Sequence, residues 1–82
     1  MVDYKFNYIQ DSFYPSAKVT FYEGNFQIVK ENEKLVRRYV RTKVLDTRIV
    51  TFDWGMGRKD MENVVNKELL KYGTPIKEQS LV

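Results

Sequence analysis

The chain contains a single alanine, Ala17, against 19 valine, isoleucine and threonine residues among its 82. β-Branched side chains pack well on pleated sheets, whereas alanine is the strongest helix former. This bias favours pleated structure over a helical bundle. Because 82 residues supply only one hydrophobic core, we expect one small domain built mainly from β-structure.

The chain has neither cysteine nor histidine. Their absence excludes disulfides, thiolate zinc sites, thiol nucleophiles and the hydrolase triads that depend on histidine. A domain of this size retains only a few kcal/mol of net stability, so a dense aromatic core or a homodimer has to compensate. Twelve aromatic residues are available for such a core or for an interface.

The sequence offers no apolar run near the roughly 18 residues that a membrane span requires. Its first four residues lack the basic start and apolar stretch of a signal peptide. We therefore expect a cytoplasmic protein without membrane association. The initial methionine suggests a complete natural chain.

Residues 3–9 alternate between apolar and polar side chains, with Tyr4, Phe6 and Tyr8 on one face. This period of two predicts a half-buried strand. Pro15 lacks a backbone N–H and stands among turn-forming residues. Residues 11–16 are therefore expected to form a loop.

A hairpin is predicted over residues 17–29. Residues 17–22 alternate around Val19 and Phe21, and Glu23-Gly24-Asn25 has the composition of a turn. Residues 26–29 then resume an apolar strand, and the polar residues 30–34 predict the next turn.

Residues 35–45 fit two periods. As a strand, the segment places Val36, Val40 and Val44 on one face; as a helix, Tyr39 joins the valines on an apolar stripe. We favour the strand because the segment is rich in β-branched residues and lacks a helix stop near Asp46.

Residues 46–47 predict a short turn before another strand over residues 48–54. Val50, Phe52 and Trp54 share one side of that strand, and Ile49 lies on the other. Apolar residues on both sides are typical of a central strand.

Residues 60–72 carry apolar side chains at helical spacing. Asp60 is the expected N-cap, Gly73 fits the position after the last turn, and Pro75 follows. From residue 74 the chain is polar and aperiodic. We expect a domain over residues 1–73 and a flexible tail over residues 74–82.

The fold predicted from this pattern is α+β: an antiparallel sheet of four to five meandering strands covered by one C-terminal helix. The order of its elements is similar to that of small single-stranded-DNA-binding transcription coactivators, although no shared motif carries the similarity.

Basic residues are concentrated between Lys34 and Arg48, where six of them face one acidic residue, Asp46. On the predicted strand, alternate positions bring three cations and one aromatic ring to the same face: Arg37, Tyr39, Arg41 and Lys43. Cations for phosphates and a ring for an unstacked base are what single-stranded nucleic acid requires. The leading hypothesis is therefore a non-enzymatic nucleic-acid-binding module. The alternative for these residues is a merely solvated strand face.

Three further cations would extend this nucleic-acid footprint: Arg48, Arg58 and Lys59. The last two follow Gly55-Met56-Gly57 ahead of the helix, where glycine backbone and a helix start favour an anion in principle. The spacing matches neither nucleotide-binding glycine motif, so a plain strand-to-helix connection is favoured.

Carboxylates are the remaining candidates for catalysis or metal binding, either Asp53, Asp60 and Glu62 together or Asp46 with Asp53. Capping and the helix dipole explain Asp60 and Glu62 better. We expect no enzyme activity, no metal and no cofactor.

Phe13 and Tyr14 stand inside the predicted loop. Exposed aromatic residues are enriched in protein interfaces, so the second hypothesis is a protein-binding adaptor or inhibitor that uses these rings or an open sheet edge. Equally open is that the loop folds both rings back onto a small core.

Overall fold

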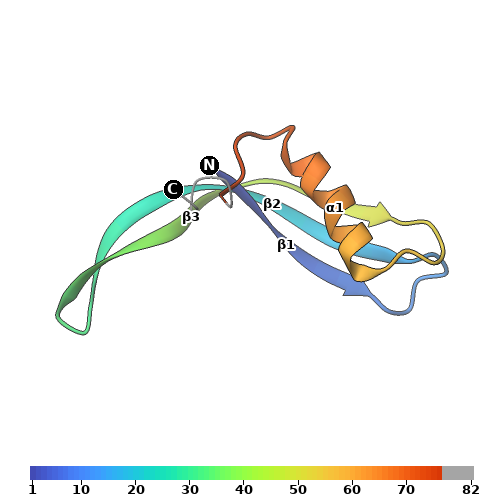
Figure 1. Cartoon of the computed structure of the whole chain (residues 1–82), viewed down its shortest axis with the longest axis horizontal. Helices are drawn as coiled ribbons and strands as arrows, with labels where there is room; N and C mark the ends of the chain where they lie inside the picture. The colour runs from blue at the N-terminus through green and yellow to red at the C-terminus, as the bar shows by residue number, and fades with distance from the viewer. Residues whose placement is uncertain (77–82) are drawn as a thin grey trace.

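The computed structural model describes residues 1–76 as a three-stranded antiparallel sheet followed by one helix (Figure 1). The strands are β1 (Val2–Ile9), β2 (Ser16–Glu31) and β3 (Lys34–Thr51), in the order β1-β2-β3, and the helix is α1 (Arg58–Leu69). The predicted α+β class, the meander and the C-terminal helix are confirmed. The prediction of four to five strands is wrong, because two expected turns lie within continuous strands.

The first of these turns, at residues 23–25, lies within β2. The Gly24 N–H donates to the carbonyl oxygen of Met1 at 2.9 Å, and the register with β3 shifts between Glu23 and Gly24. A β-bulge of this kind places one extra residue, here Thr42, in the partner strand. The glycine and its polar neighbours therefore serve a bulge, and the chain does not reverse.

The second expected turn, at residues 46–47, lies within β3. A second register shift leaves Leu45 without a partner in β2, and the Thr47 N–H donates to the Asp46 carboxylate at 2.9 Å. The strand prediction for residues 35–45 is confirmed and the helical alternative is wrong. The β3 strand lies at an edge of the sheet, so the prediction of a central strand at residues 48–54 is also wrong.

Beyond Gly24 the sheet narrows from three strands to two. We call residues 24–41, the outer halves of β2 and β3 with their turn, the arm. The predicted turn at residues 30–34 is confirmed: Asn32 and Glu33 both have positive φ, 49° and 64°, as a tight hairpin turn requires. Figure 1 shows the arm bending away from the three-stranded part, which makes the molecule 49 Å long.

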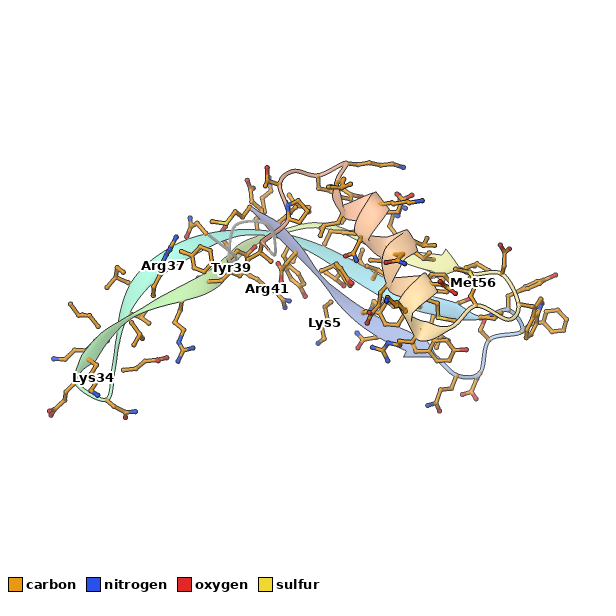
Figure 2. All side chains as sticks on the ribbon, in the orientation of Figure 1. Lys5, Lys34, Arg37, Tyr39, Arg41 and Met56 are labelled. Carbon is orange, nitrogen blue, oxygen red and sulfur yellow. The ribbon has the colours of Figure 1, made fainter. Side chains whose placement is uncertain are left out.

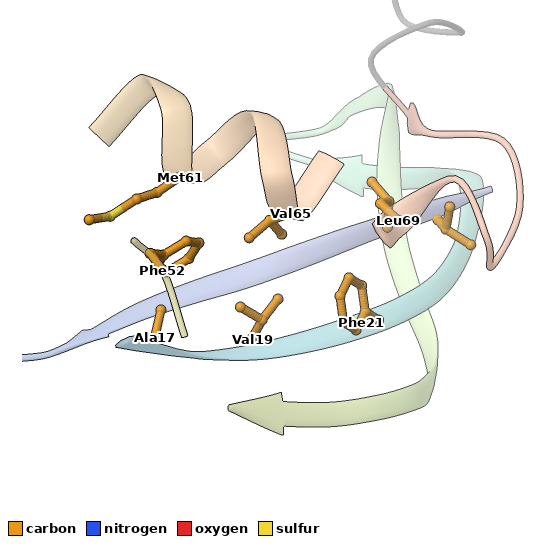
Figure 3. Packing of buried hydrophobic residues seen from close by; sticks show 8 residues of the cluster. Ala17, Val19, Phe21, Phe52, Met61, Val65 and Leu69 are labelled. Atoms are coloured by element: carbon orange, nitrogen blue, oxygen red, sulfur yellow. The ribbon is translucent and has the colours of Figure 1, made fainter. Parts of the chain in front are cut away.

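The hydrophobic core lies between α1 and the three-stranded part (Figure 3). Spacing of four residues places Met61, Val65 and Leu69 on one side of α1, and all three are buried. They pack against Ala17, Val19 and Phe21, which alternate along β2. Phe52, which follows β3, and Val2, at the start of β1, complete the core. The core thus lies on one face of the three-stranded part, and no helix or strand of residues 1–76 covers the other face.

The helix begins two residues earlier than predicted. Its N-cap is Gly57, which makes no side-chain capping bond, and Asp60 lies in the first turn. The prediction of Asp60 as N-cap is therefore wrong, although its charge still suits the helix start. The helix ends at Leu69, and residues 70–72 continue as a hydrogen-bonded turn.

The start of the expected tail lies beside β1. The Val2 N–H donates to the Thr74 carbonyl at 3.0 Å, and Val2 and Pro75 form a short parallel bridge. The rest of that predicted tail, residues 77–82, is outside the described residues. Within the described part of the chain, α1 is too short and too polar to cross a membrane.

Candidate functional site

The sheet face opposite α1 carries no other element of the described chain, and we call it the open face. Strand alternation and register decide which side chains it presents. From the three-stranded part these include Asp3, Lys5, Asn7, Lys18, Thr20 and Tyr22. From the arm they include Phe26, Arg37, Tyr39 and Arg41. Cations and aromatic rings therefore share this face along both parts of the sheet.

Two arginines of the open face lie against aromatic rings. The Arg37 guanidinium carbon is 4.3 Å from the centre of the Phe26 ring, and that of Arg41 is 4.1 Å from the centre of Tyr22. Between these pairs, Phe26 and Tyr39 meet edge to face with ring centres 5.7 Å apart. Each of these cation–π contacts helps to hold its guanidinium group against the sheet.

Asp3 ties the root of the arm to β1. Its carboxylate accepts two hydrogen bonds from Arg41, at 2.7 and 2.8 Å, and its Oδ1 lies 3.2 Å from the Tyr39 hydroxyl. Burial, followed by the Asp3 charge and hydrogen bond, raises the pKa of Tyr39 to about 12. The hydrogen bond to Asp3 also raises the pKa of Arg41. Arg41 is therefore partly engaged in structure.

The structure places Tyr39 on the same face as Arg37 and Arg41, as strand alternation predicted (Figure 2). The ring is half-buried, however, because it packs over Gly24. In this position one side of the ring packs against the backbone at Gly24 and supports the arm.

The remaining cations of the predicted footprint do not join the open face. Lys43 pairs with Glu23 beyond the bulge at Thr42, which turns it to the opposite side. Arg48 forms an ion pair with Glu68 of α1 at 2.9 Å.

The two cations at the helix start also lie away from the open face. Arg58 pairs with Glu62 at 3.5 Å and lies 5.1 Å from the centre of the Phe6 ring. Lys59 is exposed on α1. Of the seven predicted residues, the structure brings together Arg37, Tyr39 and Arg41.

Sequence reasoning missed Lys5 and Lys18, which share the open face with the arginines of the arm. Figure 2 shows Lys5 and Arg41 pointing from the sheet on the same side. Both lysines occupy polar positions of strands that were correctly predicted to alternate. Combining that alternation with the strand register would have found them.

The open face is unbalanced in charge. Five cations share this face with one carboxylate, that of Asp3: Lys5, Lys18, Lys30, Arg37 and Arg41. Ion pairs away from this face balance cations with glutamates, as in Arg38–Glu31 on the other side of the arm and Lys71–Glu68 on the helix side. The excess positive charge is therefore specific to the uncovered side of the sheet.

The acidic candidates are dispersed. No group of three or more acidic residues able to hold a metal occurs in residues 1–76. Asp46 accepts a hydrogen bond from the Tyr72 hydroxyl at 2.9 Å, and Glu62 pairs with Arg58. A groove of about 410 Å³ between α1 and β1 contains one cation, Arg58, already engaged by Glu62.

Phe13 and Tyr14 are exposed, so the alternative in which the loop folds its rings back onto the core is wrong. Trp54, predicted to share one side of a strand with Val50 and Phe52, lies beyond the end of β3 at Thr51 and is also exposed. The Trp54 ring contacts both loop rings. The spacing of about 40 residues hides this grouping from local sequence patterns.

The open face is chemically suited to holding a flexible polyanion. Lysines provide mobile point charges, and a guanidinium resting on a ring presents a flat cation with free edges. No protein-family model, curated protein or solved structure matches the chain.

Proposed function

We propose that the protein binds single-stranded nucleic acid through its open face and acts as a non-enzymatic binding module. The observation that carries this proposal is the charge asymmetry of the sheet, with five cations and one carboxylate on the uncovered side. Neutralisation of phosphates supplies much of the affinity for nucleic acid, and it needs an excess of cations on one accessible surface.

Lys5, Lys18 and Arg37 would contact phosphates. All three side chains are exposed, and none forms an ion pair within residues 1–76. Arg37 would have a second role, because a base can stack on a guanidinium plane as it does on an aromatic ring. The Phe26 ring lies 4.3 Å from the Arg37 guanidinium carbon and helps to hold this group on the open face. This geometry favours unpaired bases, whose faces are free to stack.

Nucleic-acid binding and a merely solvated face predict different oligonucleotide affinities for two matched double variants. Lys5→Gln with Lys18→Gln removes two charges from the open face. Lys59→Gln with Lys67→Gln removes two charges from exposed positions on α1. Both double variants have the same net charge, so a difference between them reports the location of the binding surface.

Fluorescence anisotropy with a labelled single strand of about 15 nucleotides measures the affinity as a function of salt. Each lost phosphate contact lowers the salt slope by about 0.7 for single strands, so the open-face variant is expected to lose about 1.4. The α1 variant should retain the slope of the unmodified protein. Equal losses in both variants, or no binding by the unmodified protein at low salt, would refute the proposal.

A further inference from the structure

Three exposed aromatic rings gather at the end of the molecule opposite the arm. Phe13 and Tyr14 come from the β1–β2 loop, and Trp54 from the loop between β3 and α1; we call them the aromatic cluster. Their ring centres lie 5.0 to 6.2 Å apart. Even so, 78% of Phe13, 51% of Tyr14 and 66% of Trp54 remain exposed. Contiguous apolar surface of this kind marks an interaction site more often than a neutral surface.

The cluster rests on an ordered base. The buried hydroxyl of Ser16 donates to the Tyr14 carbonyl at 3.0 Å, and the buried Phe52 N–H donates to the Pro15 carbonyl at 2.7 Å. Figure 1 shows the two loops side by side at this end of the sheet. The rings are therefore presented by loops fastened to the core and to each other, which lowers the entropy lost on binding.

A tight turn sets the position of Trp54. The Met56 N–H donates to the Asp53 carbonyl at 3.4 Å, and Gly55 has φ of +84°, which glycine adopts without strain. No atom lies within 4 Å of where a Gly55 Cβ would be. The backbone, and not crowding, thus accounts for a glycine beside the tryptophan.

The two loops that carry the cluster are negatively charged. Residues 10–15 and 52–57 contain two charged residues, Asp11 and Asp53, both exposed. Phosphates of a nucleic acid or of an anionic membrane would be repelled by this rim. A cationic side chain would be attracted both by the carboxylates and by the faces of the rings.

We propose that the aromatic cluster is a docking site for a segment of another protein that combines apolar side chains with lysine or arginine. The rings bury the apolar side chains, and the two carboxylates select the positive charge. This surface is separate from the open face and opposite to it in charge. The inference therefore does not depend on nucleic-acid binding.

Trp54 is the single tryptophan of the chain, so its fluorescence reports directly on the cluster. We would titrate the protein with a short peptide of alternating leucine and lysine, and with its counterpart of leucine and glutamate. The lysine peptide is expected to bind saturably and shift Trp54 emission to shorter wavelength as the ring is buried. The glutamate peptide should produce no shift at the same concentration.

Matched variants locate the binding. Phe13→Ser should abolish the shift, while Leu35→Ser, at a comparably exposed site on the arm, should leave it unchanged. Asp11→Asn with Asp53→Asn should weaken the lysine peptide several-fold, whereas Glu33→Gln with Asp60→Asn alters net charge equally and should have no effect. Circular dichroism confirms that each variant is folded. Oligonucleotide binding by Phe13→Ser should equal that of the unmodified protein.

Four outcomes would overturn the proposal. The first is that the lysine peptide causes no shift of Trp54 emission. The second is that the glutamate peptide causes an equal shift, which would indicate unselective adhesion. The third is that anionic vesicles shift the emission as strongly as the lysine peptide, which would indicate a lipid surface. The fourth is that the emission of the protein alone shifts with protein concentration and Phe13→Ser removes that shift, which would make the occupant a second copy.

Discussion

The ring of Tyr39 lies directly over the backbone of Gly24, at the point where the sheet narrows from three strands to two. A Cβ at Gly24 would stand 2.7 Å from the Tyr39 Cζ and would meet the Val40 carbonyl oxygen as well. Glycine is therefore required by close approach of the neighbouring strand. The aromatic ring replaces the packing that the glycine lacks.

Gly24→Ser is expected to destabilise the protein by about 1 to 3 kcal/mol, the usual cost of overpacking, because a carbonyl of the sheet cannot move aside. Gly57→Ser is the matched control: nothing lies within 4 Å of its Cβ position, and serine suits a helix N-cap. Urea denaturation measures both. An equal loss in the two variants would contradict the close packing described for Gly24.

Tyr39→Phe tests the contact with Asp3 through pH. The folded-state pKa of about 12 lies above the ordinary value near 10, so the protonated hydroxyl stabilises the folded state. That contribution is complete below pH 10 and is lost as the pH rises towards 12. The stability difference between the unmodified protein and Tyr39→Phe should therefore shrink over this interval. Thermal midpoints measured at successive pH values check it, and a constant difference would contradict the assignment.

Leu69→Ala should remove about 2 to 5 kcal/mol, because the Leu69 side chain is 3% exposed and packs in the core between α1 and the sheet. The neighbouring Leu70 is 58% exposed, so Leu70→Ala should change the free energy of unfolding by less than about 0.5 kcal/mol. Chemical denaturation of the two variants compares them. Similar losses would show that α1 does not face the sheet as described.

Ser16→Ala removes the buried hydroxyl that holds the loop carrying Phe13 and Tyr14. The expected loss is about 1 kcal/mol, together with a change in Trp54 emission as the cluster rearranges. Ser12→Ala, on the exposed side of the same loop, leaves the bond from Ser16 to the Tyr14 carbonyl in place. It should alter neither quantity appreciably. Unchanged emission in Ser16→Ala would separate this hydroxyl from the order of the cluster.

The local spacing of apolar residues was enough to predict the elements that pack one face against the core. Alternation at Tyr4 and Phe6 identified β1, and the four-residue spacing of Met61, Val65 and Leu69 identified the buried side of α1. Periodicity could not separate a turn from a bulge at Gly24. The two have the same composition, and the choice depends on distant partners, the Met1 carbonyl and the register of β3.

The candidate sites, too, were predicted where they depend on local alternation and missed where they depend on distant contacts. Alternation along β3 placed Arg37, Tyr39 and Arg41 together, but the extra residue at Thr42 turned Lys43 to the other side. Which face the helix covers, and therefore the grouping of Lys5 and Lys18 with the arginines, follows only from the assembled sheet. The contact between Phe13 and Trp54 likewise depends on two loops that the topology brings together.

Because the sheet changes from three strands to two, its backbone hydrogen bonds are expected to break in different ways in the arm and in the three-stranded part. In the arm, no other strand or helix of residues 1–76 covers the strand edges or either face, so hydrogen bonds can break one after another from the turn at Asn32 inward. Residues 16–23 of β2, paired on both sides and packed under α1, can open only with the whole domain. Amide hydrogen exchange should accordingly slow stepwise from the tip to Gly24 and then drop sharply. A polyanion bound along the open face would therefore contact a rigid part of the sheet at Lys18 and a more flexible part at Arg37. The arm could change its curvature to fit such a ligand at little cost in free energy.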